Sequence, residues 1–254
     1  MFNKKNVGVA VYIIIISLFI LSCMSLKTDK SIVKNNNELI VEKEYDIGAK
    51  NFVYLFKTVQ PEIDCTGLDC VGMISSTASG LVFSSYRNVI FVLTAAHFCN
   101  SDEEFSMFYN EKIIGVASEK HRELHILKMN KEKDICMLFG LKEKDESYKN
   151  IKLAKELIVG EEVYSVAAPS SIGGPGIRLI FTGKLGGCDE EICMTTMPAS
   201  FGSSGAGIYN SNHELITIIM AVPEDFKNVI LSPSNKDIEK FIQDINNLVD
   251  IYSY

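Results

Sequence analysis

Short apolar segments separated by turn residues set the narrowest limit on how this chain can fold. From about residue 50 to residue 233, strand-sized runs rich in Val, Ile, Phe and Tyr alternate with Gly, Ser, Asn and Pro. This pattern predicts an all-β protein, either a sandwich or a pair of barrels. The expected strands are Phe52–Val59, Gly80–Phe83, Val89–Thr94, Leu124–Met129, Ile135–Phe139, Glu162–Ala167, Arg178–Thr182, Ile192–Thr196, Ala206–Tyr209, Leu215–Val222 and Val229–Leu231.

One segment near the C-terminus follows a different period. Ser234 is followed three residues later by Asp237, as in the capping box that starts many helices. We therefore expect one amphipathic helix over about residues 234–250, packed on the β core. The apolar residues at helical spacing are Ile238, Phe241, Ile242, Ile245, Leu248 and Val249.

The N-terminus has the features of an export signal. Two lysines precede an apolar run from Val7 to Leu21, and the run is followed by Ser22 and Cys23. A charged start, an apolar centre and a small residue before the cleavage point are typical of secretory signals. We therefore expect an exported protein, with residues 1–22 as signal or anchor and residues 23–49 as a polar tether.

Three fates of this N-terminal segment are open. Residues 20–23 read Ile-Leu-Ser-Cys and resemble the lipobox of bacterial lipoproteins, in which Cys23 would carry the lipid. Ile20 stands where Leu is usual in that motif. Alternatively, Val7–Leu26 is long enough to cross a bilayer uncleaved, or the signal is simply removed. The lipoprotein is the interpretation adopted here, and it places the domain at a membrane of the cell envelope or in the periplasm.

The composition fits an anchor followed by one domain. The chain has 254 residues, of which 47% are apolar and 22% charged, so it can bury a core and does not have the composition of a disordered chain. The formal net charge is −7, and Lys and Arg form no block beyond the N-terminus. Nucleic acid is therefore not an expected partner.

Three local patterns carry candidate catalytic side chains, in the order His, Asp, Ser. An apolar strand runs into small residues and ends at His97. Asp134 stands at the head of another apolar strand, where a partly buried carboxylate needs a donor such as an imidazole N–H. Ser204 lies in a glycine-rich turn, residues 201–207, whose backbone N–H groups can point at one spot. Each pattern alone is common, but the ordered set is specific.

The ordered set resembles the motifs of the chymotrypsin/trypsin family, and within it the bacterial HtrA-type and glutamyl-endopeptidase-type branches. The resemblance covers about residues 50–250. It implies an all-β fold of two six-stranded antiparallel β-barrels, at about residues 50–148 and 149–233, with a C-terminal α-helix over residues 234–250. The catalytic cleft would lie between the two barrels.

The same resemblance implies a serine endopeptidase that hydrolyses peptide bonds of peptide or protein substrates through an acyl-enzyme. Ser204 would be the nucleophile, His97 the general base and acid, and Asp134 the residue that orients the imidazole. The backbone N–H groups of Gly202 and Ser204 would form the oxyanion hole. This chemistry needs no metal and no cofactor. A catalytically silent binding module on the same fold is the competing interpretation.

The family's substrate pocket is altered in this sequence. Ser203 replaces the aspartate that, in trypsin, pairs with a newly formed N-terminus, so activation by that ion pair does not apply. Pro198 aligns with the base of the trypsin pocket, and Met220 and Val222 align with its wall. Ile219 stands where glutamyl endopeptidases carry a histidine. We therefore predict cleavage after a small or medium apolar residue rather than after Arg, Lys or Glu.

Six cysteines remain when Cys23 is set aside from the seven in the chain, and an even number in an exported protein suggests disulfides. Two of the expected pairs would each close a short loop. The third would join the cysteines that lie two residues after His97 and Asp134, provided that these two side chains meet. Alternatively, the third pair consists of free buried thiols. The favoured pairs are Cys65–Cys70, Cys188–Cys193 and Cys99–Cys136.

The remaining histidines and acidic stretches suggest no further site. His121 and His125 lie in a strand-like segment without a third ligand, so a metal is not expected. His213 lies in a polar turn, where we expect it to be exposed. The acid-rich residues 102–104 and 142–146 are expected to form solvated loops.

Overall fold

The computed structural model describes residues 45–61, 73–100, 109–117, 119–169 and 177–251. The predicted signal, the predicted lipidation residue Cys23, most of the predicted tether and the predicted pair Cys65–Cys70 lie outside the described residues, as does the acidic stretch 102–104. No helix in the described ranges has the length and apolar character needed to span a membrane.

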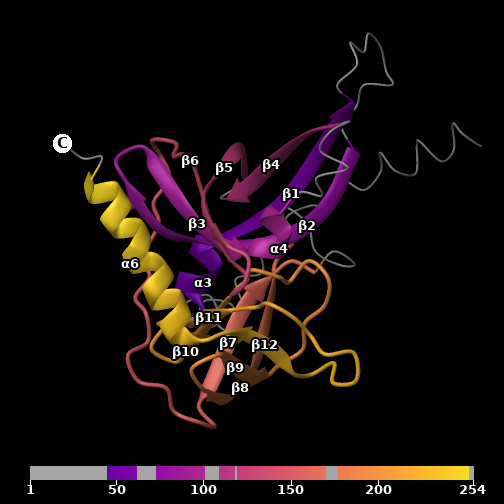
Figure 1. Ribbon diagram of the computed structural model, residues 1–254, viewed down its shortest axis with the longest axis vertical. Coiled ribbons are helices and arrows are strands. Elements are labelled where there is room, and N and C mark those ends of the chain that lie inside the picture. The colour runs from indigo at the N-terminus through magenta and orange to yellow at the C-terminus, as the bar shows by residue number, and fades with distance from the viewer. Residues whose placement is uncertain (1–44, 62–72, 101–108, 118, 170–176, 252–254) are drawn as a thin grey trace, which may run out of the picture. The chain divides into compact units, whose positions relative to one another are not determined.

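The first barrel contains six antiparallel strands that close on themselves. Their order around the barrel is β1-β2-β3-β6-β5-β4, and β1 pairs with both β2 and β4 (Figure 1). Val53, Leu55 and Val92 are fully buried inside it. The strands are β1 (Phe52–Pro61), β2 (Met73–Tyr86), β3 (Val89–Ala95), β4 (Tyr109–Ala117), β5 (Lys120–Asn130) and β6 (Ile135–Leu141).

The second barrel is nearly closed. Its six strands run in the order β11-β10-β7-β8-β9-β12. The two outer strands approach each other, since Thr217 Oγ1 donates to the carbonyl of Pro233 at 2.7 Å and Ala221 bridges to Leu231. The predicted pair of six-stranded antiparallel barrels is therefore confirmed. The strands are β7 (Glu162–Ala167), β8 (Leu179–Cys188), β9 (Ile192–Thr196), β10 (Gly207–Asn210), β11 (Leu215–Ile218) and β12 (Ile230–Pro233).

The folded body starts before the predicted boundary at residue 50. Helix α3 (Asp46–Asn51) occupies residues that the sequence analysis assigned to the tether. Fully buried Asn51 fixes it, because its Nδ2 donates to the carbonyls of Val82 and Lys149 at 2.6 Å each. Asn51 Oδ1 also accepts from the Lys149 amide at 3.2 Å. Asn51 follows a polar segment, so the sequence does not indicate these buried hydrogen bonds, which form only when the barrel strands pack around it.

The C-terminal helix α6 (Asn235–Ile251) packs against residues of both barrels (Figure 1). The predicted cap is present: the Asp237 amide donates to Ser234 Oγ at 3.1 Å, and that hydroxyl donates to Asp237 Oδ2 at 2.7 Å. The expected apolar face is buried at Ile238 and Phe241. Lys128 of β5 adds an ion pair with Asp244 at 2.7 Å. The helix therefore fastens the first barrel to the second.

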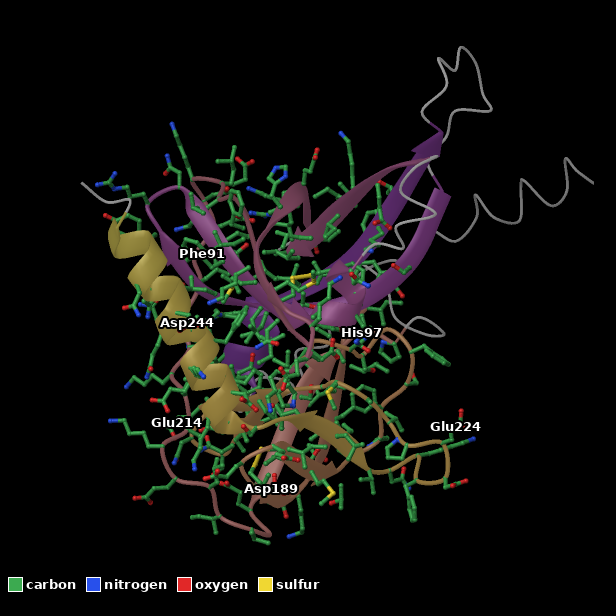
Figure 2. The ribbon with its side chains drawn as sticks, in the orientation of Figure 1. Phe91, His97, Asp189, Glu214, Glu224 and Asp244 are labelled. Carbon is green, nitrogen blue, oxygen red and sulfur yellow. A yellow bond between two sulfur atoms is a disulfide. The ribbon has the colours of Figure 1, made fainter. Side chains whose placement is uncertain are left out.

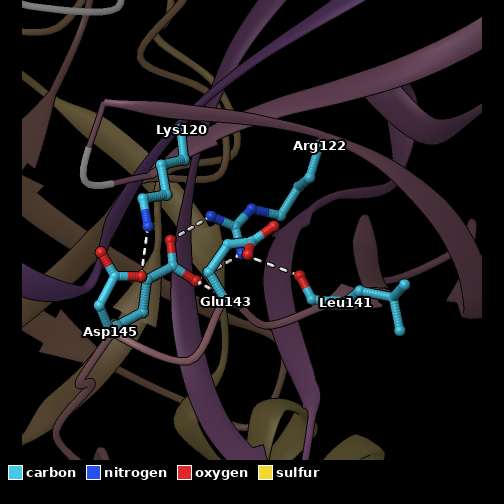
Figure 3. A network of polar contacts seen from close by, with 6 residues as sticks. Lys120, Arg122, Leu141, Glu143 and Asp145 are labelled. Atoms are coloured by element: carbon cyan, nitrogen blue, oxygen red, sulfur yellow. Dashed lines mark hydrogen bonds and ion pairs between the residues drawn. The ribbon is translucent and has the colours of Figure 1, made fainter.

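The prediction of a solvated loop at residues 142–146 is wrong at its last residue. Glu146 is buried and accepts hydrogen bonds from Nη1 and Nη2 of Arg122 on β5. Figure 3 shows the polar network around Arg122. Lys120 and Asp145 form a second ion pair at the exposed rim. Because a two-point Arg–carboxylate pair is strongly oriented, it holds the segment after β6 against β5. A run of charges in the sequence does not distinguish such a buried pair from a hydrated loop.

Candidate active site

His97 lies on a short helix, α4 (Ala96–Cys99), that follows β3 without a loop. Ala95 and Ala96 are almost completely buried, and their small side chains let the chain turn tightly at the barrel end. Figure 2 shows His97 in the region where the first barrel meets the second. Its side chain is 52% exposed, so the ring is open to a substrate.

Asp134 holds His97 at two points. Its Oδ2 lies 2.7 Å from His97 Nδ1, and its Oδ1 accepts the backbone N–H of His97, also at 2.7 Å. The carboxylate side chain is only 14% exposed. The Ala96 amide donates to the Asp134 carbonyl at 3.1 Å, so backbone and side chain together align α4 with the start of β6. With Nδ1 facing the carboxylate, Nε2 is left to exchange a proton in the cleft.

Asp134 has a backbone φ of 54°, in the left-handed region that most side chains avoid. Aspartate tolerates this region better than bulky residues do. The turn aims the carboxylate back at α4, while Ile135 begins the ladder with Ala95 of β3. The side chains of Asp134 and His97 therefore meet, as the position of Asp134 at the head of an apolar strand predicted.

Ser204 is carried by a turn that needs glycine on both sides. Gly202 and Gly205 have φ values of 89° and 83°. The Ser203 amide donates to the Ser200 carbonyl at 2.9 Å, and the Gly205 amide donates to Ile219 at 2.7 Å. These bonds fix the turn at both ends. Ser203 is fully buried, whereas Ser204 is half-buried and faces the cleft.

The first barrel also holds the Ser204 turn, through Ser79 of β2. The Ser79 amide donates to the Ser204 carbonyl at 2.9 Å, and the Ser79 hydroxyl donates to the Gly202 carbonyl at 2.8 Å. The same hydroxyl accepts the Ala168 amide of the second barrel at 3.1 Å. Sequence reasoning missed this role. No local signal indicates it, because the complete burial of Ser79 is a property of the fold.

Gly205 lies in a close contact between the barrels. A Cβ built there would lie 2.1 Å from Thr94 Oγ1 and 2.3 Å from the Ser79 carbonyl oxygen. The Thr94 hydroxyl donates to that same carbonyl at 2.8 Å. Gly205, directly after Ser204, is therefore required by space as well as by backbone conformation.

One cleft of about 1130 Å³ receives both His97 and Ser204. Its lining comes from β2 and α4 of the first barrel, and from the Ser204 turn and residues 219–224 of the second. Within the described part of the chain, no hydrogen bond joins Ser204 Oγ to the His97 ring. Catalytic hydrogen bonds are often long in a ligand-free site and tighten when substrate binds.

Two of the three predicted pocket residues line the cleft. Met220 and Val222 line the cleft, as does Ile219. Pro198 is exposed and is not among the lining residues, whereas its neighbour Ala199 is. The wall beside Ser204 is therefore aliphatic, and the charged lining residues Glu224 and Lys227 lie in the segment after it.

Two of the three predicted disulfides are formed by described residues. Cys99 pairs with Cys136, with a Cα–Cα distance of 6.6 Å, and both residues are buried. Cys188 pairs with Cys193 at the β8–β9 turn. The alternative of free thiols is therefore wrong for Cys99 and Cys136. The first bridge ties α4 to β6, the two elements next to the His97–Asp134 pair.

The remaining histidines lie apart from the cleft lining. His121 and His125 are exposed on β5. His213 is half-buried rather than exposed as expected, because its Nδ1 lies 3.0 Å from the hydroxyl of Tyr164. Among the described residues, no three His, Cys, Asp or Glu side chains are grouped so that they could hold a metal ion.

Two six-stranded antiparallel barrels, with a bonded His–Asp pair and a glycine-flanked serine in one cleft, define the two-barrel peptidase class of fold. The model of the trypsin-like peptidase domain family matches residues 78–218, and the chain belongs to that family. The crystal structure of the serine endoprotease from Yersinia pestis is similar, with a TM-score of 0.61 at 15% identity. The match covers 80% of this chain and 65% of that one, and at this identity it supports the fold alone. No curated protein matches the chain in sequence.

Proposed function

We propose that this protein is a serine endopeptidase with His97, Asp134 and Ser204 as its catalytic triad. The observation that carries the proposal is the two-point contact between Asp134 and His97, in a cleft that Ser204 also lines. A carboxylate bound to Nδ1 selects the tautomer in which Nε2 can accept a proton. Membership of the trypsin-like peptidase domain family supports the same chemistry.

In the proposed mechanism, Ser204 Oγ attacks the carbonyl carbon of the scissile peptide, and its proton passes to His97 Nε2. The C=O bond becomes a C–O⁻ single bond, which the N–H groups of Gly202 and Ser204 stabilise. The tetrahedral intermediate then expels the amine, which takes the proton from His97 and leaves an acyl-enzyme. Water attacks the ester by the same sequence of proton transfers and restores the serine. Asp134 stabilises the imidazolium in both halves of the reaction.

The cleft supports cleavage after a small or medium apolar residue. Its wall carries the apolar side chains Ile219, Met220 and Val222, whereas the lining carboxylate Glu224 lies in the segment after this wall, together with Lys227. A peptide-library digest analysed by mass spectrometry tests this preference. Ala, Val and Leu before the cut are expected, and a profile dominated by Arg, Lys or Glu would contradict it.

The proposal includes export and attachment to a membrane through lipidated Cys23. It rests on the signal-like sequence of residues 1–23. Metabolic labelling with an alkyne fatty acid, followed by mass analysis of the mature N-terminus, tests it, with Cys23→Ser as the control. A soluble form without residues 1–26 is expected to retain all activity, because the anchor only sets location. Labelling that persists in Cys23→Ser would refute the assignment.

Reaction of the purified protein with a fluorophosphonate probe tests the peptidase itself. The wild type should be labelled at Ser204, as shown by peptide mapping. Ser204→Ala should not be labelled, and Asp134→Asn should react about 10⁴-fold more slowly because the imidazole adopts the wrong tautomer. A folded wild type that is neither labelled nor hydrolyses peptides would instead identify a silent binding module on this fold.

A further inference from the structure

Lys57 of β1 is a charged residue buried beside the active-site helix. Only 4% of it is exposed, and it is not itself among the residues that line the cleft. An ammonium group withdrawn from water is costly unless hydrogen bonds and an opposite charge compensate it. The groups around the Lys57 ammonium therefore show which interactions compensate for its burial.

Three contacts surround the Lys57 ammonium. Nζ donates to the backbone carbonyl of Asn100 at 2.9 Å and to Glu111 Oε2 of β4 at 3.2 Å. It also lies 5.7 Å from the centre of the Phe98 ring, a cation–π distance. Two of these three partners, Asn100 and Phe98, belong to α4 or to its C-terminal cap.

Helix α4 depends on such contacts because it is too short to be stable alone. It has four residues, and the Asn100 amide closes its single turn by donating to the Ala96 carbonyl at 2.8 Å. Lysine near a helix C-terminus satisfies the last carbonyls, which have no partner in the helix. Asp134 and the Cys99–Cys136 bridge hold α4 to β6. Lys57 holds it to a different pair of strands, β1 and β4.

We propose that Lys57 is a positioning residue for His97, acting through the Asn100 carbonyl and the Phe98 ring. The inference rests on the proposed function, in which His97 must face Ser204. Loss of the clamp would let α4 shift along its contact with β1 while the bonds to Asp134 remain. Since misplacement of a catalytic base by about 1 Å can reduce the rate about 100-fold, a partial release should lower kcat more than it raises KM.

The test compares four variants of the complete protein. Lys57→Met keeps the length of the side chain but removes the charge and the donor. Lys57→Arg restores a donor. Glu111→Gln removes the ion pair but leaves the Nζ contact to Asn100. Lys112→Met is the matched control, because Lys112 lies next to Glu111 on β4 and makes an exposed ion pair with Glu123 at 3.3 Å.

Two readouts are measured: kcat and KM on a peptide, and amide hydrogen exchange in residues 96–100. For Lys57→Met we expect kcat to fall about 10-fold and KM to change less than about 2-fold. Exchange at the Asn100 amide, which closes the helix turn, should accelerate about 10-fold, as for loss of one charged hydrogen bond, whereas the Ala96 and His97 amides, which donate to Asp134, should change less. Lys57→Arg should recover most of both. Glu111→Gln should lower the melting temperature, because it leaves the buried ammonium without an opposite charge, but keep kcat within about 2-fold of wild type.

The outcomes separate this inference from the peptidase proposal. If wild type and all variants fail to hydrolyse peptides, the peptidase proposal fails, and the exchange data alone decide whether Lys57 holds α4. Exchange in residues 96–100 that is equal in Lys57→Met and Lys112→Met would overturn the inference. Equal losses of kcat in Lys57→Met and Glu111→Gln would also overturn the inference, because Lys57 would then contribute only to stability.

Discussion

Removal of the Cys99–Cys136 bridge should lower stability and activity together, whereas removal of the Cys188–Cys193 bridge should lower stability alone. The first bridge spans 37 residues and the second spans 5. From the loop-closure entropy of the unfolded chain, the expected losses of unfolding free energy are about 4 kcal/mol and about 2 kcal/mol, respectively. Only the first bridge touches α4, so only its loss frees the end of the helix that carries His97.

The comparison uses the double variants Cys99→Ala/Cys136→Ala and Cys188→Ala/Cys193→Ala. Urea unfolding gives the free energies, and fluorophosphonate labelling of Ser204 is measured where each variant is more than nine-tenths folded. We expect the first variant to react about 10-fold more slowly than wild type, a modest fraction of the loss caused by gross misplacement of a base. The second should react within about 2-fold of wild type. Equal labelling rates of the two folded variants would refute the idea that the bridge positions His97.

Three further perturbations follow from the structure. Gly205→Ala should lower the free energy of unfolding, measured in urea, by at least about 3 kcal/mol, because Gly205 has a positive φ and a Cβ there would overlap neighbouring atoms. Gly160→Ala is the control: Gly160 has a similar φ of 86° but open space around it, so the loss should be about 1 kcal/mol. Burial opposes the charge of Glu146 and is the largest single effect on its pKa. The hydrogen bond and charge of Arg122, with hydrogen bonds from the Glu143 amide and Tyr148, together outweigh burial and lower the pKa of Glu146 below its usual 4.5. The stability that ionised Glu146 contributes to the protein is thus complete above its unfolded-state pKa, and it is lost as the pH falls through its lower folded-state pKa. Glu146→Gln should therefore be about 3 kcal/mol less stable at pH 7, and the difference should shrink below about pH 4 in pH-dependent melting. Val222→Gly should raise kcat/KM about 10-fold for peptides with Phe before the cut, and an unchanged profile would contradict the pocket assignment.

Much of the candidate site follows from local sequence patterns. A strand that ends in small residues before His97, an acid at the head of a strand, and a serine between glycines are each short-range features. Their geometry could be anticipated because strand ends and glycine turns restrict the backbone within a few residues. The Cys99–Cys136 bridge was also accessible from the sequence, since its cysteines have the same offset from His97 and Asp134.

The contacts that hold these pieces together could not be read in the same way. Ser79 ties the Ser204 turn to the first barrel, Lys57 clamps α4, and the Arg122–Glu146 pair secures the segment after β6. Each joins residues that are far apart in the chain, so each depends on strand register and on closure of a barrel. An isolated serine or lysine inside a strand pattern looks the same whether it is solvated or buried with partners.

Local sequence patterns were enough to predict eleven of the twelve strands that the structure describes, the closing helix with its Ser234–Asp237 cap, and the chemical identity of the proposed triad. They did not predict β4. The predicted features are properties of neighbouring residues, which the backbone and side-chain period fix locally. Which polar groups are buried, and what they bind, became clear only in the folded protein. Burial is a property of the assembled barrels, and a polar group removed from water must find its partner wherever the fold places one.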